Sequence, residues 1–193
     1  MARPRNFDCD KVLYQAMNLF WKKGYEATSL NDILQSTGLS KSSLYETFGT
    51  KHELFLSTFQ LYHHHHMKVL NELLTTGDNA LNGIENFLNS ILAPTIENKN
   101  SLGCMTSNEA IELAPHDSEF RQLVEKNFFD IEEAFFKSIK LGQTDGSINA
   151  LHDARAFSRF LSVNLQGLNV MARANIDKNV LIDTIEIILK ILR

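Results

Sequence analysis

Small hydroxyl groups, a lysine and a tyrosine are concentrated between Gly38 and Gly49, and their chemistry suits contacts with nucleic acid. The residues concerned are Lys41, Ser42, Ser43, Tyr45 and Thr47. Their O–H and N–H groups can donate hydrogen bonds to phosphate oxygens and to the edges of bases. Glu46 lies among them, and an acid in a DNA groove must accept from a cytosine amino group or be repelled by phosphate.

Two short helical patterns with a glycine turn between them would position these side chains. Ser29 is expected to cap the first helix, with Asp32 completing a capping box. Ser40 is expected to cap the second helix, in which Leu44 and Phe48 face inward and the polar set faces outward. This arrangement is a helix-turn-helix, which lays its second helix in the DNA major groove. An ordinary helical hairpin with a solvated polar face has the same local features.

A longer pattern at fixed spacing runs through Gly24-Tyr25, Thr28-Ser29-Leu30, Ile33, Thr37-Gly38-Leu39-Ser40-Lys41, Ser43-Leu44-Tyr45, Phe48 and Lys51-x-Glu53-Leu54. It resembles the DNA-binding signature of the TetR family of one-component transcriptional repressors. The resemblance covers about the first quarter of the chain. Beyond it, the chain is similar to the family in length and helical character. One departure is Thr47, where the family usually carries tyrosine or histidine.

The resemblance implies a homodimeric repressor that reads an inverted-repeat operator in double-stranded DNA and is released by a small-molecule effector. Lys41, Ser42, Ser43 and Tyr45 are then expected to contact the groove and the backbone. Thr28, Thr47 and Lys51 are expected to anchor phosphates, and Ser29 belongs to the same DNA-binding set.

Charge is unevenly distributed along the 193 residues. The net charge is −4, but residues 1–52 hold seven Lys/Arg against five Asp/Glu, and the remainder holds twelve against eighteen. The cationic part therefore coincides with the helix-turn-helix pattern, where basic groups add salt-dependent affinity for phosphate. Arg3 and Arg5 form a short arm that could reach phosphate or the minor groove, unless it is simply a disordered terminus.

Composition favours a helical globular protein, with 44% hydrophobic and 22% charged residues and three prolines. No apolar stretch approaches the ~20 residues of a membrane span, and MARPRNFDCD lacks the apolar centre of a signal peptide. We therefore expect a cytoplasmic protein without membrane contact. The predicted fold is all-α, with about nine helices: a three-helix head at 1–50 and a helical effector-binding and dimerisation bundle at 51–193. Gly142 and Asp145-Gly146 are expected to form a turn in the bundle.

Residues for an effector pocket are expected among the body helices. The set is Tyr62, His66, Cys104, Met105, Asn108, Phe128 and Asn164. The last helix, from Asp177 onward, is apolar on several sides. Because such a helix needs a second partner to bury it, and because the family pairs its last two helices across a dimer, we expect a homodimer.

Two other chemistries are open. Cys104 lies at the start of a predicted helix, where the pKa of a thiol can be depressed. The sequence Gly103-Cys104-Met105 is also similar to that of a subset of TetR-type regulators in which the cysteine can sense oxidants or electrophiles. The alternative is that Cys104 is a small buried hydrophobic residue. His63 to His66 could serve a metal carrier or a small helical enzyme. No complete ligand set or acid/base pair accompanies them. We therefore predict no enzyme, no metal and no cofactor.

Overall fold

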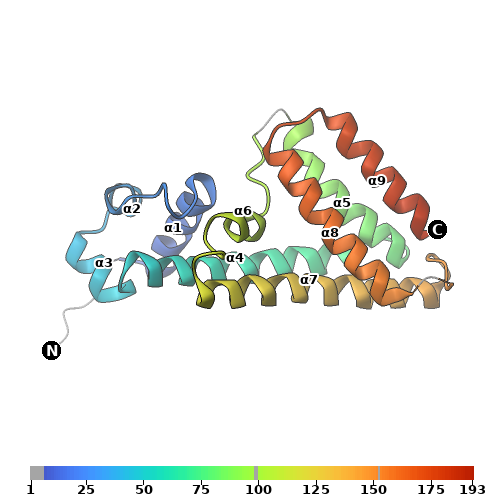
Figure 1. The fold of residues 1–193 in the computed structure, drawn as a ribbon, viewed down its shortest axis with the longest axis horizontal. Coiled ribbons are helices and arrows are strands. Elements are labelled where there is room, and N and C mark those ends of the chain that lie inside the picture. Colours follow the sequence, from blue (N-terminus) through green and yellow to red (C-terminus); the bar gives the residue numbers. More distant parts are fainter. Residues whose placement is uncertain (1–6, 98–99, 152) are drawn as a thin grey trace.

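The chain folds into helices joined by short loops. The computed structural model describes residues 7–97, 100–151 and 153–193, and within these ranges it contains nine α-helices and no strand (Figure 1). The helices are α1 Cys9–Lys23, α2 Leu30–Thr37, α3 Lys41–Phe48, α4 Lys51–Leu74, α5 Ala80–Ile96, α6 Met105–Glu112, α7 Ser118–Asp145, α8 Ala154–Arg173 and α9 Lys178–Leu192. The predicted all-α fold is confirmed. None of these helices is long and apolar enough to cross a membrane.

Local capping signals fix the boundaries of the head helices. Ser29 caps α2 in a reciprocal capping box with Asp32, and Thr50 caps α4 in the same way with Glu53. Gly38 ends α2 with φ 71°, a left-handed conformation that glycine adopts without steric cost. The sharp turn between α2 and α3 is therefore encoded locally.

The molecule is elongated, with the head α1–α3 at one end and α5, α8 and α9 at the other (Figure 1). The long helices α4 and α7 connect the two ends, and α6 lies between the head and the body (Figure 1). The orientation of the head relative to the body therefore depends on the tilt of α4.

Two hydrophobic cores hold these parts together. The first combines the head with the first half of α4, with α6 and with the start of α7, through Phe20, Leu44, Phe55, Met105 and Phe120. The second lies among α4, α5, α7, α8 and α9. The head core thus continues across residue 50. The division of the chain at that residue remains a prediction.

The predicted turn is confirmed at Asp145-Gly146 and wrong at Gly142. Gly142 lies inside α7, which continues to Asp145 before Gly146 ends it with φ 81°. A Cβ at Gly142 would overlap the side chain of Ile148, so glycine is needed here for close packing and not for a turn. The glycine is therefore explained by packing against the chain just after the turn, six positions later.

Candidate nucleic-acid interface and ligand cavity

The outer face of α3 carries the polar side chains that the sequence predicted to face outward. Lys41, Ser42, Tyr45 and Glu46 are exposed, with Tyr45 43% exposed, whereas Leu44 is fully buried beneath them. The Nζ atom of Lys41 lies 5.8 Å from the centroid of the Tyr45 ring. The face therefore presents one ammonium group, one phenol and one carboxylate to solvent.

A cluster of serines surrounds the N-terminus of α3. The Oγ atom of Ser40 accepts from the backbone N–H of Ser43 at 3.2 Å. The same Oγ atom lies 3.0 Å from the Oγ of Ser42 and 2.9 Å from the Oγ of Ser43. These hydroxyls lie at the positive end of the helix dipole, where an anionic group is favoured.

The remaining predicted contacts occupy different environments. Ser29 is exposed, but its hydroxyl donates to Asp32 Oδ2 at 2.7 Å. Lys51 Nζ lies 4.2 Å from the centroid of the Tyr25 ring, and Thr47 is half-buried. Lys51 is thus held beside the head by a cation–π contact. Arg3 and Arg5 lie outside the described residues.

Thr28, predicted to anchor a phosphate, does not reach the surface. Its side chain is fully buried, and its hydroxyl donates to the carbonyl oxygen of Gly24 at 2.7 Å. The hydroxyl therefore closes the turn between α1 and α2. Because it is inaccessible, we remove Thr28 from the expected phosphate contacts.

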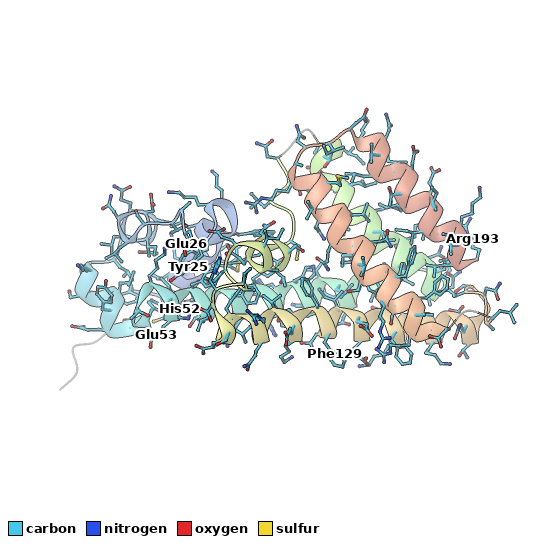
Figure 2. All side chains as sticks on the ribbon, in the orientation of Figure 1. Tyr25, Glu26, His52, Glu53, Phe129 and Arg193 are labelled. Carbon is cyan, nitrogen blue, oxygen red and sulfur yellow. The ribbon has the colours of Figure 1, made fainter. Side chains whose placement is uncertain are left out.

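Two glutamates of α6 lie at its boundary with the head, and one of them bonds to the head. Glu112 Oε1 accepts from the backbone N–H of Glu26 at 2.7 Å. Glu26 is labelled in the head in Figure 2. Glu109 is 1% exposed, and neither of its carboxyl oxygens has a hydrogen-bond partner among the described residues. Burial, assisted by the nearby charge of Glu112, raises the pKa of Glu109 to about 8. Glu109 is therefore protonated at neutral pH.

A cavity of about 550 Å³ lies between the head and the body. Tyr14, Met17 and Trp21 of α1 form one wall, and residues of α4, α5, α8 and the loop 100–103 form the others. Trp21 Nε1 donates to the carbonyl oxygen of Gly103 at 3.1 Å and fixes that loop against α1. Sequence reasoning missed this wall, although its three residues are spaced to share one face of a helix.

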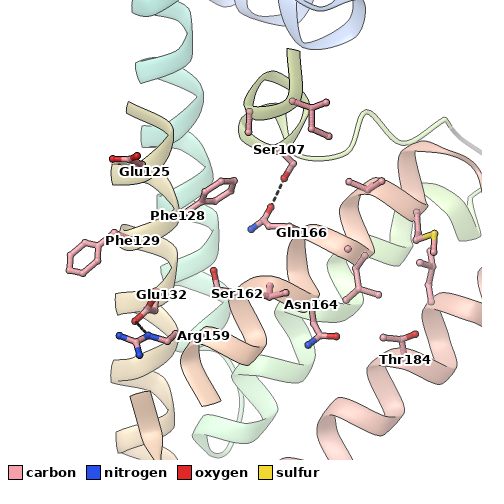
Figure 3. A pocket seen from close by; sticks show the side chains of 18 of the residues that line it. Ser107, Glu125, Phe128, Phe129, Glu132, Arg159, Ser162, Asn164, Gln166 and Thr184 are labelled. Atoms are coloured by element: carbon pink, nitrogen blue, oxygen red, sulfur yellow. Dashed lines mark hydrogen bonds and ion pairs between the residues drawn. The ribbon is translucent and has the colours of Figure 1, made fainter. Parts of the chain in front are cut away.

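The predicted effector residues divide into three groups. Tyr62 and His66 line the cavity, and Cys104 is 2% exposed in contact with Tyr62. Met105 is fully buried, and Asn108 is committed to the carbonyl oxygen of Leu102 at 3.1 Å, so neither lines the cavity. The two remaining residues, Phe128 and Asn164, line a separate groove on the outer face of the body (Figure 3).

The outer groove encloses about 950 Å³ between α6, α7, α8 and α9. Figure 3 shows the polar pairs that cross it, Ser107 with Gln166 and Glu132 with Arg159. Between these pairs the lining is apolar and exposed. Phe129, labelled on α7 in Figure 2, is 57% exposed, and Val163 is 72% exposed.

The histidine run is dispersed around α4. His63 Nε2 lies 2.9 Å from Asp130 Oδ2, which also pairs with Lys126. Burial lowers the pKa of His63 despite that carboxylate. Across the described part of the chain, no group of three or more His, Cys, Asp or Glu side chains is arranged to hold a metal ion.

The fold and the exposed face of α3 define a helix-turn-helix transcriptional regulator with a helical body. Residues 12–58 match the family described as bacterial regulatory proteins, tetR family, and residues 80–188 match the tetracyclin repressor-like C-terminal domain. The chain belongs to the TetR family. The predictions of the family and of a helix-turn-helix regulator are therefore confirmed. Operator DNA as partner, a dimeric state and an effector response are typical of this family.

Individual relatives are similar to this chain over most or all of its length. The chain is 30% identical over 193 residues, all of both proteins, to the uncharacterized HTH-type transcriptional regulator YezE of Bacillus subtilis (strain 168). It is 27% identical over 173 residues to the HTH-type transcriptional repressor ComR of Escherichia coli (strain K12), covering 89% of this chain and 82% of ComR. It is also similar to a cysteine mutant of the TetR family regulator CifR complexed with 26-bp double-strand operator DNA. That similarity has a TM-score of 0.86 and 27% identity, over 97% of this chain and 98% of CifR.

Proposed function

We propose that this protein is a homodimeric transcriptional repressor that binds an inverted-repeat operator and is released by a small-molecule effector. The observation that carries the proposal is the exposed face of α3, with Lys41, Ser42 and Tyr45 around a buried Leu44. The similarity to CifR bound to operator DNA, and to a relative named as a repressor, supports the same function. The relatives are regulators, and the proposal includes action in the cytoplasm and no enzymatic step.

The proposed DNA contacts are Lys41, Ser42, Ser43 and Tyr45 in the groove and on the backbone. Ser29, Thr47 and Lys51 are proposed nearer the phosphates. Thr47 is shorter than the tyrosine or histidine that the family usually carries at this position, so any phosphate contact there is shorter or lost.

The apolar outer face of the body supports the dimer. Val163, Val170, Met171, Ile187 and Ile191 on α8 and α9 are all more than two-fifths exposed. A second copy would remove this surface from water, and a twofold axis would place two α3 helices in successive major grooves. The effector would then act by favouring a body shape whose heads no longer match that spacing.

A thiol-based response through Cys104 is a second candidate with weaker support. Its thiol is 2% exposed, so an oxidant would need the cavity to open. Replacement of Cys104 by Ser tests this candidate, because operator release by oxidants and electrophiles should disappear only if the thiol is the sensor.

The DNA-binding proposal is tested on operators selected from a random duplex library. Tyr45→Ala should weaken binding at least about tenfold in fluorescence anisotropy while leaving the oligomeric state unchanged. Lys41→Ala should reduce the dependence of log Kd on log salt by about one, whereas Lys140→Ala on the exposed surface of α7 should not. Wild-type affinity of Tyr45→Ala at moderate salt would overturn the assignment of α3.

A further inference from the structure

The cavity between α1, α4, α5 and α8 is built for an uncharged ligand. None of the described residues that line it is Asp, Glu, Lys or Arg. A charged ligand placed there would lose its hydration without gaining an ion pair, which is costly. A volume of about 550 Å³ is within the usual range for small-molecule sites.

Aromatic rings dominate the walls. Tyr62 and His66 are stacked, with ring centroids 5.6 Å apart and an interplanar angle of 9°. Trp21 meets Tyr62 edge-on at 5.0 Å, and Phe87 meets His66 at 6.3 Å. Such walls offer faces and edges that suit a planar aromatic guest.

Among the polar groups of the cavity, the imidazole of His66 is the one that belongs to the stacked aromatic wall and is neutral. Trp21 Nε1 is bonded to Gly103, and the side-chain amide of Asn169 donates to Leu165 O at 2.9 Å. Burial lowers the pKa of His66 to about 4, so its imidazole is neutral at pH 7, and its contacts are the rings of Tyr62 and Phe87. A neutral imidazole can donate one hydrogen bond and accept another.

Arg173 is the cation that hydrogen-bonds to residues of the cavity wall, and its Nη1 group is used in those bonds. Arg173 donates to the carbonyl oxygens of Leu102 at 3.2 Å and of Trp21 at 3.5 Å, from outside the cavity. It is therefore not placed to neutralise an anion inside.

From this chemistry we infer that the cavity binds an uncharged, mainly aromatic small molecule that stacks against Tyr62 and His66 and hydrogen-bonds to the His66 imidazole. The binding chemistry follows from the cavity alone, and only the role of the ligand as an effector of DNA binding rests on the proposed function. Because α1 supplies a wall, such a ligand contacts the head directly and not only through α4.

Two dyes that share one skeleton test the charge requirement. N-phenyl-1-naphthylamine is uncharged, and 1-anilinonaphthalene-8-sulfonate carries an added sulfonate. Trp21 is the only tryptophan of the chain, so excitation of tryptophan reports bound dye by energy transfer, and the substitutions below show which of the two sites holds the dye. The uncharged dye should bind at least about tenfold more tightly than the sulfonate.

Matched substitutions separate the cavity from the outer groove. Val69→Phe fills the mouth of the cavity, and Val163→Phe makes the same change in the groove. Because Val69 is 47% exposed, folding should tolerate the larger side chain. Ser90→Phe, at another exposed position of the cavity lining, is the second variant that fills the cavity. We expect both cavity variants to weaken the uncharged dye about tenfold or more, and Val163→Phe to leave it unchanged.

Equal affinity for the two dyes, no transfer from Trp21, or loss of binding only in Val163→Phe would each overturn the inference. The titration contains no DNA, so these results would leave the regulator proposal standing. Failure of Tyr45→Ala to affect operator binding would, conversely, reject the regulator proposal without altering the dye result.

Discussion

Replacing the buried carboxyl of Glu109 by the isosteric amide should remove a large pH dependence of folding stability. Burial raises the pKa of Glu109 to about 8, against an ordinary value of 4.5 that applies to the unfolded chain. Between these two values the folded protein binds more protons than the unfolded chain. The free energy of unfolding therefore falls as pH rises through this window.

The magnitude follows from the same values. Raising the pKa from 4.5 to about 8 corresponds to about 5 kcal/mol, at about 1.4 kcal/mol per tenfold change in proton affinity. His66 acts in the opposite direction, because burial lowers its pKa to about 4; its contribution grows with pH and is complete near 6.5. Above about pH 6.5, Glu109 dominates, and it should account for a loss of about 2 kcal/mol by pH 8.

Urea unfolding of the wild type and of Glu109→Gln, at about pH 6.5 and pH 8 and at one protein concentration, measures this difference. The wild type should lose about 2 kcal/mol more than the variant between the two pH values. Glu119→Gln, at an exposed position of α7, is the control and should follow the wild type. Parallel profiles for wild type and Glu109→Gln would show that Glu109 is ionised normally and would refute the reasoning.

Three further outcomes can be measured directly. Gly83→Ala should lower the free energy of unfolding by about 1–3 kcal/mol in urea, because its Cβ would overlap the carbonyl oxygen of Leu74; an unchanged value would contradict that close approach. Ser29→Ala should cost about 1 kcal/mol by loss of the α2 cap, and an unchanged Tm would speak against the capping box. Val163→Asp should convert dimer to monomer in sedimentation velocity, and an undiminished dimer would place the interface elsewhere.

The parts of the fold that were predictable depend on interactions within one or two helical turns. The capping boxes Ser29/Asp32 and Thr50/Glu53 are complete within four residues, so the start of each helix could be inferred from the sequence. Leu44 at the centre of α3 likewise identified the inner side and thereby the outer face. Such signals need no knowledge of the partner surface.

The parts that were missed are those that local signals do not decide. The hydroxyl of Thr28 can either face solvent or donate to the carbonyl oxygen of Gly24, four positions earlier, and only the burial of Thr28 in the packed head selects the second arrangement. Trp21 lines the cavity beside the loop at Gly103, which lies 82 positions away and whose carbonyl oxygen accepts the indole N–H of Trp21. Phe128 and Asn164 line the outer groove and not the cavity, because helical spacing alone does not determine which of the two sites an apolar stripe faces, and their role in effector binding stays a prediction.

The position of α1 between the cavity and α3 explains how a ligand in the cavity could affect DNA binding. Val12, Ala16 and Phe20 on one face are buried in the head core with Leu44 of α3, while Trp21 on the other face borders the cavity. A close-packed core moves as a unit and does not deform continuously. A ligand that shifted α1 relative to α5 and α8 would therefore shift α3 with it, because both helices belong to the same packed core, and the contact between Glu112 and the backbone of Glu26 would oppose a shift of α1 relative to α6.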